Sequence, residues 1–145
     1  MAAIWKKEFN LEELNLFSRE CIVGHLDIEF IEKGNDFLSA TMPVDQRTTQ
    51  PLGILHGGAS VVLAETLGSA ASYMTLDENH QSVGLEIKAN HLKSISKGSV
   101  TGIAKPIHIG KTTQVWDISI ENEKKGLICV SRLTMAVLKI STEKE

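Results

Sequence analysis

The segment that decides the fold covers residues 57–76 and has the sequence GGASVVLAETLGSAASYMTL. Small residues dominate it, and its single charge is that of Glu65. A carboxylate at the centre of a membrane-spanning helix is costly, whereas a helix buried within protein suits the same composition. The segment therefore predicts one long helix that packs against the rest of the chain and does not cross a membrane.

Segments with strand character flank this helix on both sides. Residues 25–32 and 36–42 precede it as two predicted strands, and Lys33, Gly34 and Asn35 supply the turn between them. Four more predicted strands follow the helix, at residues 83–90, 99–107, 114–121 and 127–140. Consecutive strands with short polar connections pair antiparallel, so these four are expected to form a meander.

The order of these elements predicts the fold class. A lone apolar helix beside an antiparallel sheet has to bury itself against that sheet. We therefore expect an α+β fold in which an antiparallel sheet packs against one long helix. A short amphipathic helix is predicted around Leu14, and residues 141–145 are expected to be a solvated tail.

Length and composition limit the classes of function. The chain has 145 residues, which suits one domain over residues 1–145, and its formal net charge of -3 gives no reason to expect nucleic-acid binding. Its beginning lacks the apolar core of a signal peptide, so a cytoplasmic location is expected. Cys21 and Cys129 lack the CxxC spacing and are expected to be free thiols, and the five histidines show no His-x-x-x-His pair, so no metal site is predicted.

The entrance to the long helix carries the first candidate for chemistry. Gly57 and Gly58 follow His56 at this point, and glycine lets the backbone approach a ligand closely. The first N–H groups of a helix have no partner within it and lie at the positive end of its dipole. A carbonyl oxygen placed there would be polarised, and His56 is positioned to help hold it.

Glu65 is the second candidate, and Ser69 follows it one turn later on the same helix face. An isolated buried carboxylate is expensive, so Glu65 has either a chemical role or a cationic partner. The residue pattern alone leaves both interpretations open. It also leaves open that His56 is an ordinary loop histidine.

The segment QPLGILHGGAS at residues 50–60, followed by AETLGS at residues 64–69, closely resembles the hotdog-fold thioesterases. Within that family it is most similar to the branch of 1,4-dihydroxy-2-naphthoyl-CoA, phenylacetyl-CoA and 4-hydroxybenzoyl-CoA thioesterases. The similarity extends through IWK at residues 4–6, MPVD at residues 42–45, Arg47-Thr48 and residues 84–93.

This resemblance implies an α+β hotdog fold, in which an antiparallel sheet of five or six strands wraps around one long central helix. It also implies a role for each matching position. Glu65 matches the catalytic carboxylate, acting as general base or as nucleophile, and the backbone N–H of Gly57 matches the group that holds the thioester oxygen. His56 matches a histidine that orients the substrate, Gln50 a glutamine near the departing thiol, and Ser69 a serine that places the acyl group or the water. Such sites form between two subunits, so a homodimer, and often a homotetramer, is expected.

The resemblance also implies an acyl-CoA substrate and no separate cofactor, because coenzyme A is part of the substrate. The candidates for contacts with CoA are Asn90, His91, Lys93 and Lys111. Lys93 and Ser94 stand where many relatives have Arg-Pro, so Lys93 offers a positive charge without the bidentate fork of arginine.

Aromatic acyl-CoA is the first expectation for the substrate, with 1,4-dihydroxy-2-naphthoyl-CoA and hence menaquinone biosynthesis included, and broad activity is the alternative. Two further functions are compatible with the same fold. One is a non-catalytic acyl-CoA-binding module, and the other is a hydratase or dehydratase. The chain has no spare length for an effector domain and lacks the differently spaced Asp and His that the hydratases use.

Overall fold

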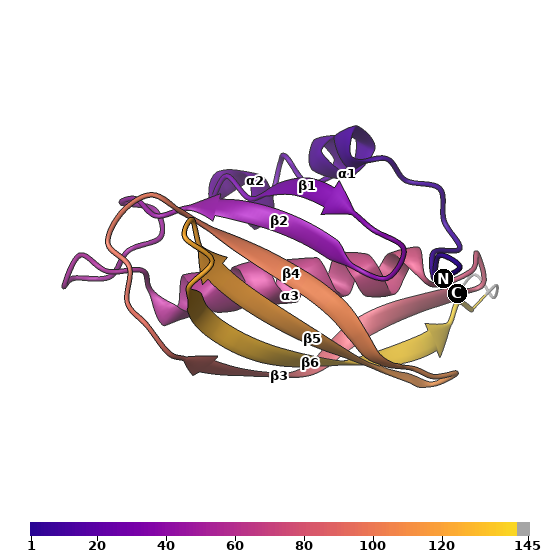
Figure 1. The fold of residues 1–145 in the computed structure, drawn as a ribbon. Helices are drawn as coiled ribbons and strands as arrows, with labels where there is room; N and C mark the ends of the chain where they lie inside the picture. The colour runs from indigo at the N-terminus through magenta and orange to yellow at the C-terminus, as the bar shows by residue number, and fades with distance from the viewer. Residues whose placement is uncertain (142–145) are drawn as a thin grey trace.

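The computed structural model describes residues 1–141 and contains a sheet that curves around one long helix (Figure 1). The part of the predicted tail beyond Ser141 lies outside the described residues. The elements in chain order are α1 (Leu11–Phe17), α2 (Ile22–His25), β1 (Glu29–Lys33), β2 (Leu38–Pro43), α3 (Gly57–Met74), β3 (His80–His91), β4 (Ser99–Ile109), β5 (Thr113–Asn122) and β6 (Leu127–Lys139).

All neighbouring strands pair antiparallel in a six-stranded sheet with the order β1-β2-β4-β5-β6-β3. The prediction of a hotdog fold with five or six strands around a central helix is confirmed. The prediction that β3 begins a four-strand meander is wrong, because β3 pairs with β6 and the meander contains only β4, β5 and β6. Residues 92–98 join β3 to β4. The backbone N–H of Leu92 donates to the carbonyl of Ile128 on β6, and the carbonyl of Ile95 accepts from the N–H of Leu55 in the loop before α3. The segment therefore crosses the end of the sheet and does not form a tight turn.

The start of the first strand is also corrected by the structure. The sequence predicts a strand from His25, but Ile22–His25 form the short helix α2 and β1 begins at Glu29. Asp27 adopts a φ of 56°, a left-handed conformation that interrupts an extended path. A single residue of this kind leaves no hydrophobic periodicity, so the pattern of apolar residues does not reveal it.

α3 packs tightly onto the concave side of the sheet through its small residues. Ala64, Gly68 and Ala71 are fully buried. A Cβ added at Gly68 would lie 2.5 Å from Cδ2 of Leu133 on β6, a separation that no real contact tolerates. The small-residue stripe therefore brings the helix axis close to the sheet and fixes the rotation of α3 about that axis.

The opposite face of α3 lies under α1, α2 and the edge strand β1 (Figure 1). These three elements, together with the residues that precede α1, are called the N-terminal layer below. Asn10 begins α1 with a complete capping box, in which its side chain accepts from the backbone of Glu13 and the Glu13 carboxylate accepts from the backbone of Asn10. Within the described part of the chain, none of the helices combines the length and the hydropathy that a bilayer crossing requires.

Candidate active site

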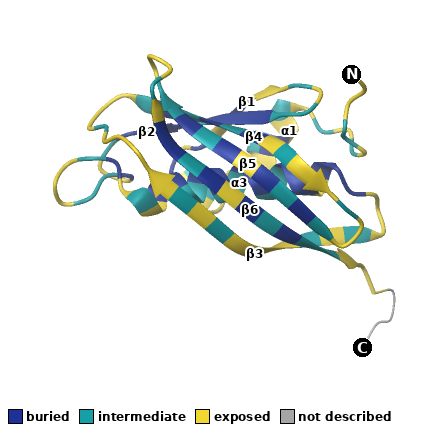
Figure 2. Cartoon of the chain, turned by 60° about the horizontal axis from the view of Figure 1, so that its bottom comes forward, coloured by how far each residue is buried: buried dark blue, intermediate teal, exposed yellow. Residues whose placement is uncertain are grey.

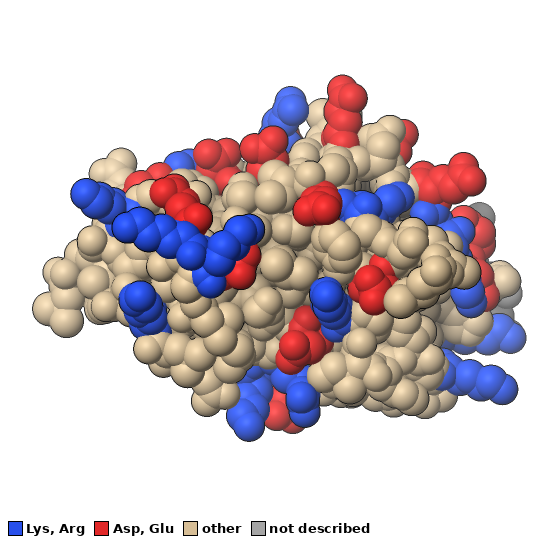
Figure 3. Space-filling model, viewed as in Figure 1, with Lys and Arg blue, Asp and Glu red and all other residues tan. Residues whose placement is uncertain are grey.

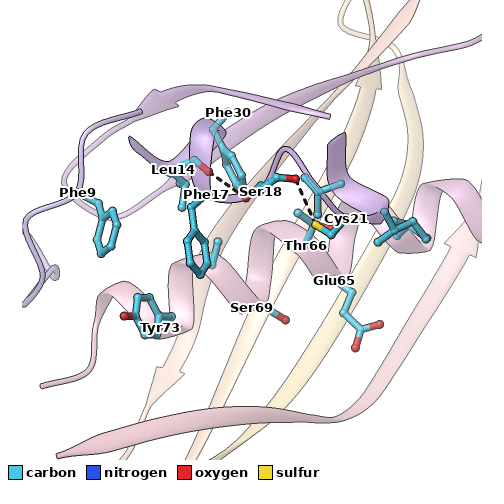
Figure 4. A pocket seen from close by; sticks show the side chains of 14 residues that line it. Phe9, Leu14, Phe17, Ser18, Cys21, Phe30, Glu65, Thr66, Ser69 and Tyr73 are labelled. Atoms are coloured by element: carbon cyan, nitrogen blue, oxygen red, sulfur yellow. Dashed lines mark hydrogen bonds between the residues drawn. The ribbon is translucent and has the colours of Figure 1, made fainter. Parts of the chain in front are cut away.

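A cavity of about 520 Å³ lies between α3 and the N-terminal layer. Figure 4 shows side chains from both sides pointing into it. Most of its lining is apolar, and the residues are Phe9, Leu14, Phe17, Ser18, Cys21, Ile22, Val23, Phe30, Val62, Glu65, Thr66, Ser69, Ala70 and Tyr73. It fits the usual pattern of a ligand site, a concave apolar space with few polar groups.

The Glu65 carboxylate lies at one end of this cavity and points toward β3 (Figure 4). A Cβ added at Gly84 of β3 would lie 3.0 Å from Oε1 of Glu65, so the glycine makes room for the carboxylate. No Lys, Arg or His side chain of residues 1–141 forms an ion pair with Glu65. The interpretation of Glu65 as a structural carboxylate held by a cation is therefore not supported.

Two hydroxyl groups line the same cavity from α3. Thr66 and Ser69 are half-buried, and neither hydroxyl forms a hydrogen bond within the described residues. Two other polar groups of the lining are occupied, since the Ser18 hydroxyl donates to the carbonyl of Leu14 and the Cys21 thiol donates to the carbonyl of Ser18. The hydroxyls of Thr66 and Ser69 are therefore free to bond to a substrate or to water beside the carboxylate.

The start of α3 forms a second polar group of residues. His56 is the N-cap of the helix, and its Nδ1 accepts a hydrogen bond of 2.7 Å from the backbone N–H of Gly58. The N–H of Gly57 has no acceptor among residues 1–141. A Cβ added at Gly57 would lie 2.8 Å from Nε2 of His91, so the imidazole at the end of β3 rests against this glycine.

The loop before α3 is rigidly tied to its surroundings. The Thr48 hydroxyl donates to the carbonyl of Pro43 at 2.8 Å, and the backbone N–H of His56 donates to the carbonyl of Thr48 at 2.8 Å. Arg47 contacts the carboxylate of Asp45 at 2.6 Å, and this guanidinium holds the pKa of the Asp45 carboxyl below its usual value. These bonds fix the path by which the chain enters the helix.

The Gln50 side chain takes part in the turn at the tip of this loop. Its Oε1 accepts from the backbone N–H of Leu52, and the backbone N–H of Gly53 donates to the carbonyl of Gln50 at 2.8 Å. Leu52 at the tip is 84% exposed, and Gly53 has a φ of 77°, which glycine adopts without strain. The loop thus presents Gln50 and an apolar tip at the surface of the chain.

Within one chain these two groups of residues do not meet. Glu65 and Ser69 line the cavity, whereas Gln50, His56 and Gly57 do not. Eight residues separate Gly57 from Glu65, which is about 12 Å along a helix axis at 1.5 Å per residue. Within one chain, the Glu65 carboxylate is therefore not placed at the opening turn of its own helix.

The four predicted CoA contacts lie in separate places. His91 touches Gly57, and Asn90 faces the outer side of the sheet beside Asp117 and Arg132. Lys111 lies in a cleft at the other end of the molecule, next to the end of α3. This chain by itself brings only His91 to the start of the helix.

Lys93 lies in a shallow cleft close to the loop that precedes α3. Ile54 of that loop, Lys97 and Lys124 share the cleft with it. Figure 3 shows several Lys and Arg side chains at the corresponding end of the molecule with acidic side chains among them, and Glu123 lines the same cleft. Three lysines therefore lie together at the end of the chain where α3 begins.

Sequence reasoning named part of this site and missed the rest. It named Glu65 and Ser69, which both line the cavity. It missed Thr66 and Gly84 and all residues of the N-terminal layer. The available signal for Gly84 was its position inside a strand, because a glycine there often marks a close approach of another group or a β-bulge. The structure shows the approach of the Glu65 carboxylate at Gly84 and an irregular pairing register between Gly84 and Glu86.

The two cysteines differ in their surroundings. Cys21 is exposed at the cavity, and Cys129 is buried in the sheet, where desolvation raises the pKa of its thiol. Among residues 1–141, no three side chains of His, Cys, Asp or Glu come together in a way that would hold a metal ion.

Comparison with known proteins connects this geometry to a family. Residues 52–129 match the model of the thioesterase superfamily. A 1,4-dihydroxy-2-naphthoyl-CoA hydrolase of Escherichia coli strain K12 is 54% identical over 93% of this chain and 99% of its own length. A proofreading thioesterase of Cronobacter turicensis is 50% identical over 93% of this chain and 98% of its own.

Solved structures give the same result. The crystal structure of a thioesterase from Haemophilus influenzae superposes with a TM-score of 0.94 at 49% identity and covers 97% of this chain and 99% of its own. A mutant thioesterase from Pseudomonas aeruginosa, with one glutamine replaced by alanine, superposes with a TM-score of 0.93 at 47% identity and covers 95% and 100%.

The N-cap bond at His56 generates a stability prediction. We expect His56→Ala to lower the free energy of unfolding by about 0.5–2 kcal/mol, because Gly58 loses its acceptor at the exposed helix start. His56→Asn is the matched control, since asparagine caps helices well and should recover most of that loss. Urea unfolding followed by circular dichroism measures both, and equal stabilities of the two variants would contradict a capping role.

Proposed function

This chain belongs to the thioesterase superfamily, and we propose that it hydrolyses acyl-CoA thioesters to a free acid and CoA with Glu65 as the catalytic carboxylate. The observation that carries the proposal is the position of Glu65. Its carboxylate lines an apolar cavity without a cationic partner among residues 1–141, next to the free hydroxyls of Thr66 and Ser69.

The chemistry of a thioester suits such a site. A thiolate has a pKa near 8.5 in its free form and leaves without strong acid assistance. The protein then has two tasks, to polarise the carbonyl and to supply an attacking group. We assign the first to the N–H of Gly57 and the second to Glu65, which either removes a proton from water or attacks the carbonyl carbon itself. In the first route the water oxygen bonds to the carbonyl carbon, the C–S bond breaks, and the proton taken up by Glu65 passes to the departing thiolate. In the second route the C–S bond breaks as Glu65 forms a mixed anhydride with the acyl group, and water then hydrolyses that anhydride, which releases the acid and restores Glu65 while the thiolate takes up a proton.

The two halves of the site are joined by a second copy of the chain in this proposal. β3 is an edge strand without a buried residue (Figure 2), and its Val83 and Leu85 are 46% and 64% exposed. Long open edges of this kind readily pair with another chain. Because Glu65 points toward Gly84 of that strand, a partner docked along β3 approaches the carboxylate directly.

In the resulting homodimer, Gln50, His56 and Gly57 of one chain face Glu65 and Ser69 of the other. Two-fold symmetry makes the arrangement reciprocal, so each dimer holds two sites. Assembly of dimers into a homotetramer is compatible with the exposed outer face of the sheet, and the activity does not require it.

The CoA portion of the substrate is assigned to the positive end of the chain. Lys93 and its neighbours Lys97 and Lys124 lie beside the loop that carries Gln50, so they are suited to the phosphates of CoA. Lys111 lies near the end of α3, in the same cleft as Lys6, and takes no part in this assignment.

The acyl group is assigned to the cavity beneath the N-terminal layer. The rings of Phe9, Phe17, Phe30 and Tyr73 line it, which suits an aromatic acyl group. The relative that is named a 1,4-dihydroxy-2-naphthoyl-CoA hydrolase supports a bicyclic aromatic acid as the first substrate to test. Ranking a panel of aromatic and aliphatic acyl-CoAs by kcat/KM separates this preference from broad activity.

Replacement of Glu65 tests the catalytic assignment. We expect Glu65→Ala to lower kcat by at least about 10²-fold, the smaller end of what general-base catalysis contributes, because no other carboxylate of residues 1–141 lines the cavity. Glu65→Gln keeps the shape of the side chain but removes the carboxylate. This variant should still bind acyl-CoA, as measured by calorimetry, but should no longer hydrolyse it. Release of CoA is followed with a thiol-reactive dye, and full activity of Glu65→Ala would sink the assignment.

Proline at position 57 tests the backbone donor. Gly57 is the first helical residue and His56 already has φ -69° and ψ 131°, so the backbone at both positions accepts proline, which removes the N–H and adds a Cβ against His91. We expect Gly57→Pro to lower kcat by about 10²–10³-fold through loss of the oxyanion donor. Gly57→Ala is the control, because it displaces the exposed His91 ring in the same way but keeps the N–H; equal losses in both variants would contradict the donor role.

Charges on the open edge test the shared site. We expect the double variant Val83→Lys and Leu85→Lys to shift the protein from dimer to monomer in sedimentation velocity and to lose hydrolysis together with assembly. Ile107→Lys is the control, since this side chain is 51% exposed on an interior strand. A monomeric wild-type protein that hydrolyses acyl-CoA at micromolar concentration would rule out the shared site.

A further inference from the structure

The end of the acyl cavity that lies away from Glu65 is formed by aromatic rings from two distant segments. The rings of Phe9 and Tyr73 meet edge to face with their centroids 6.1 Å apart. Figure 4 shows this pair at one end of the cavity and Glu65 at the other, with Ser69 between them. The cavity therefore has a chemical end and an aromatic end.

The separation of the two ends follows from the helix itself. Glu65, Ser69 and Tyr73 are spaced by four residues and line one face of α3. The eight residues from Glu65 to Tyr73 cover about 12 Å along the axis at 1.5 Å per residue. An acyl group bound with its carbonyl at Glu65 extends along this face toward the ring pair.

The ring pair is held in place by Lys7. Its ammonium group donates to the carbonyls of Leu76 at 2.6 Å, Asp77 at 3.2 Å and Tyr73 at 3.3 Å, and it lies 4.3 Å from the centroid of the Tyr73 ring. A cation at this position also complements the negative end of the helix dipole.

The backbone around Lys7 is fixed as well. The N–H groups of Lys6 and Lys7 both donate to the carbonyl of Met74, at 2.9 and 3.2 Å, and the indole of Trp5 donates to the carbonyl of Gly34 at 2.7 Å. The first residues of the chain are thereby attached to the end of α3, and Phe9 follows them directly. Its ring is set against Tyr73 by a rigid segment.

We propose that Phe9 and Tyr73, held by Lys7, form an end wall that sets the longest acyl group the site accepts. The inference rests on the proposed function, because it assigns the acyl group to this cavity. Phe9 and Lys7 lie outside residues 52–129, the part that matches the thioesterase superfamily, whereas Tyr73 lies within it, so in this proposal both parts of the chain contribute to the wall. Phe9 and Tyr73 select the substrate, and Lys7 is a positioning residue.

Straight-chain acyl-CoAs of increasing length test the wall. Hexanoyl-, octanoyl-, decanoyl- and dodecanoyl-CoA are compared by kcat/KM for the wild type, Phe9→Ala and Tyr73→Leu. A methylene that fits or fails to fit an apolar pocket changes rates on the order of tenfold, so the ratio of dodecanoyl- to hexanoyl-CoA should rise by at least about tenfold in both variants. Circular dichroism and thermal unfolding of each variant show whether the fold is retained, so that the ratio between the two substrates carries the test.

Lys7 is tested with a conservative rescue. Lys7→Met removes the bonds to the helix end and should raise the same ratio, because the ring pair loosens, whereas Lys7→Arg keeps the charge and should restore the wild-type ratio. Leu16→Ala is the matched control, since this leucine of α1 is 60% exposed and does not line the cavity.

The possible results separate the two proposals. A wild-type protein that hydrolyses none of these substrates, nor any aromatic acyl-CoA, refutes the proposed function. If the wild type hydrolyses these substrates and kcat/KM depends on acyl length in the same way in Phe9→Ala, Tyr73→Leu and the wild type, the end wall is refuted. The role of Glu65 is not affected by that result. If the ratio of kcat/KM for dodecanoyl-CoA to that for hexanoyl-CoA is unchanged in Lys7→Met, Lys7 does not position the ring pair.

Discussion

The close packing of α3 against the sheet determines the position of every group at the candidate site. A side chain at Gly68 would force Leu133 to shift, so this close contact favours the observed rotation of the helix about its axis. With the small residues facing the sheet, Glu65, Ser69 and Tyr73 have to face the N-terminal layer. The carboxylate is therefore held by the rigid core and needs no bond of its own to be oriented.

The long helix and most of the strands were predictable from the sequence because they depend on strong local signals, whereas the hotdog arrangement of these elements was implied by the family resemblance of residues 50–69. The only long apolar helix, the alternation in β5 and the turn at Lys33–Asn35 each have one interpretation. The position of β3 was not predictable in this way, since partners in a sheet depend on the path of residues 92–98 and not on the pattern within a strand. The α2 turn was missed for a similar reason, because Asp27 alone redirects the chain.

The candidate site was predictable in its residue types and less so in its geometry. Glu65 was identified because it is the only charge in an apolar helix, and its environment in the cavity agrees with that prediction. The spacing of eight residues indicated that Glu65 and Gly57 lie on the same side of the helix. It did not draw attention to the distance of about 12 Å that separates them along the helix axis. The N-terminal wall of the cavity lacks any motif, so only the three-dimensional structure reveals Phe9 and Lys7 beside Tyr73.

The central claim, that Glu65 of one chain acts with Gly57 of another, is tested most directly by mixing two inactive proteins. Glu65→Ala and Gly57→Pro subunits are co-expressed with different tags, and the mixed dimer is purified through both. The account predicts that each parent dimer is inactive and that the mixed dimer regains hydrolysis, because one of its two sites combines an intact Glu65 with an intact Gly57. A mixed dimer as inactive as its parents would contradict the account.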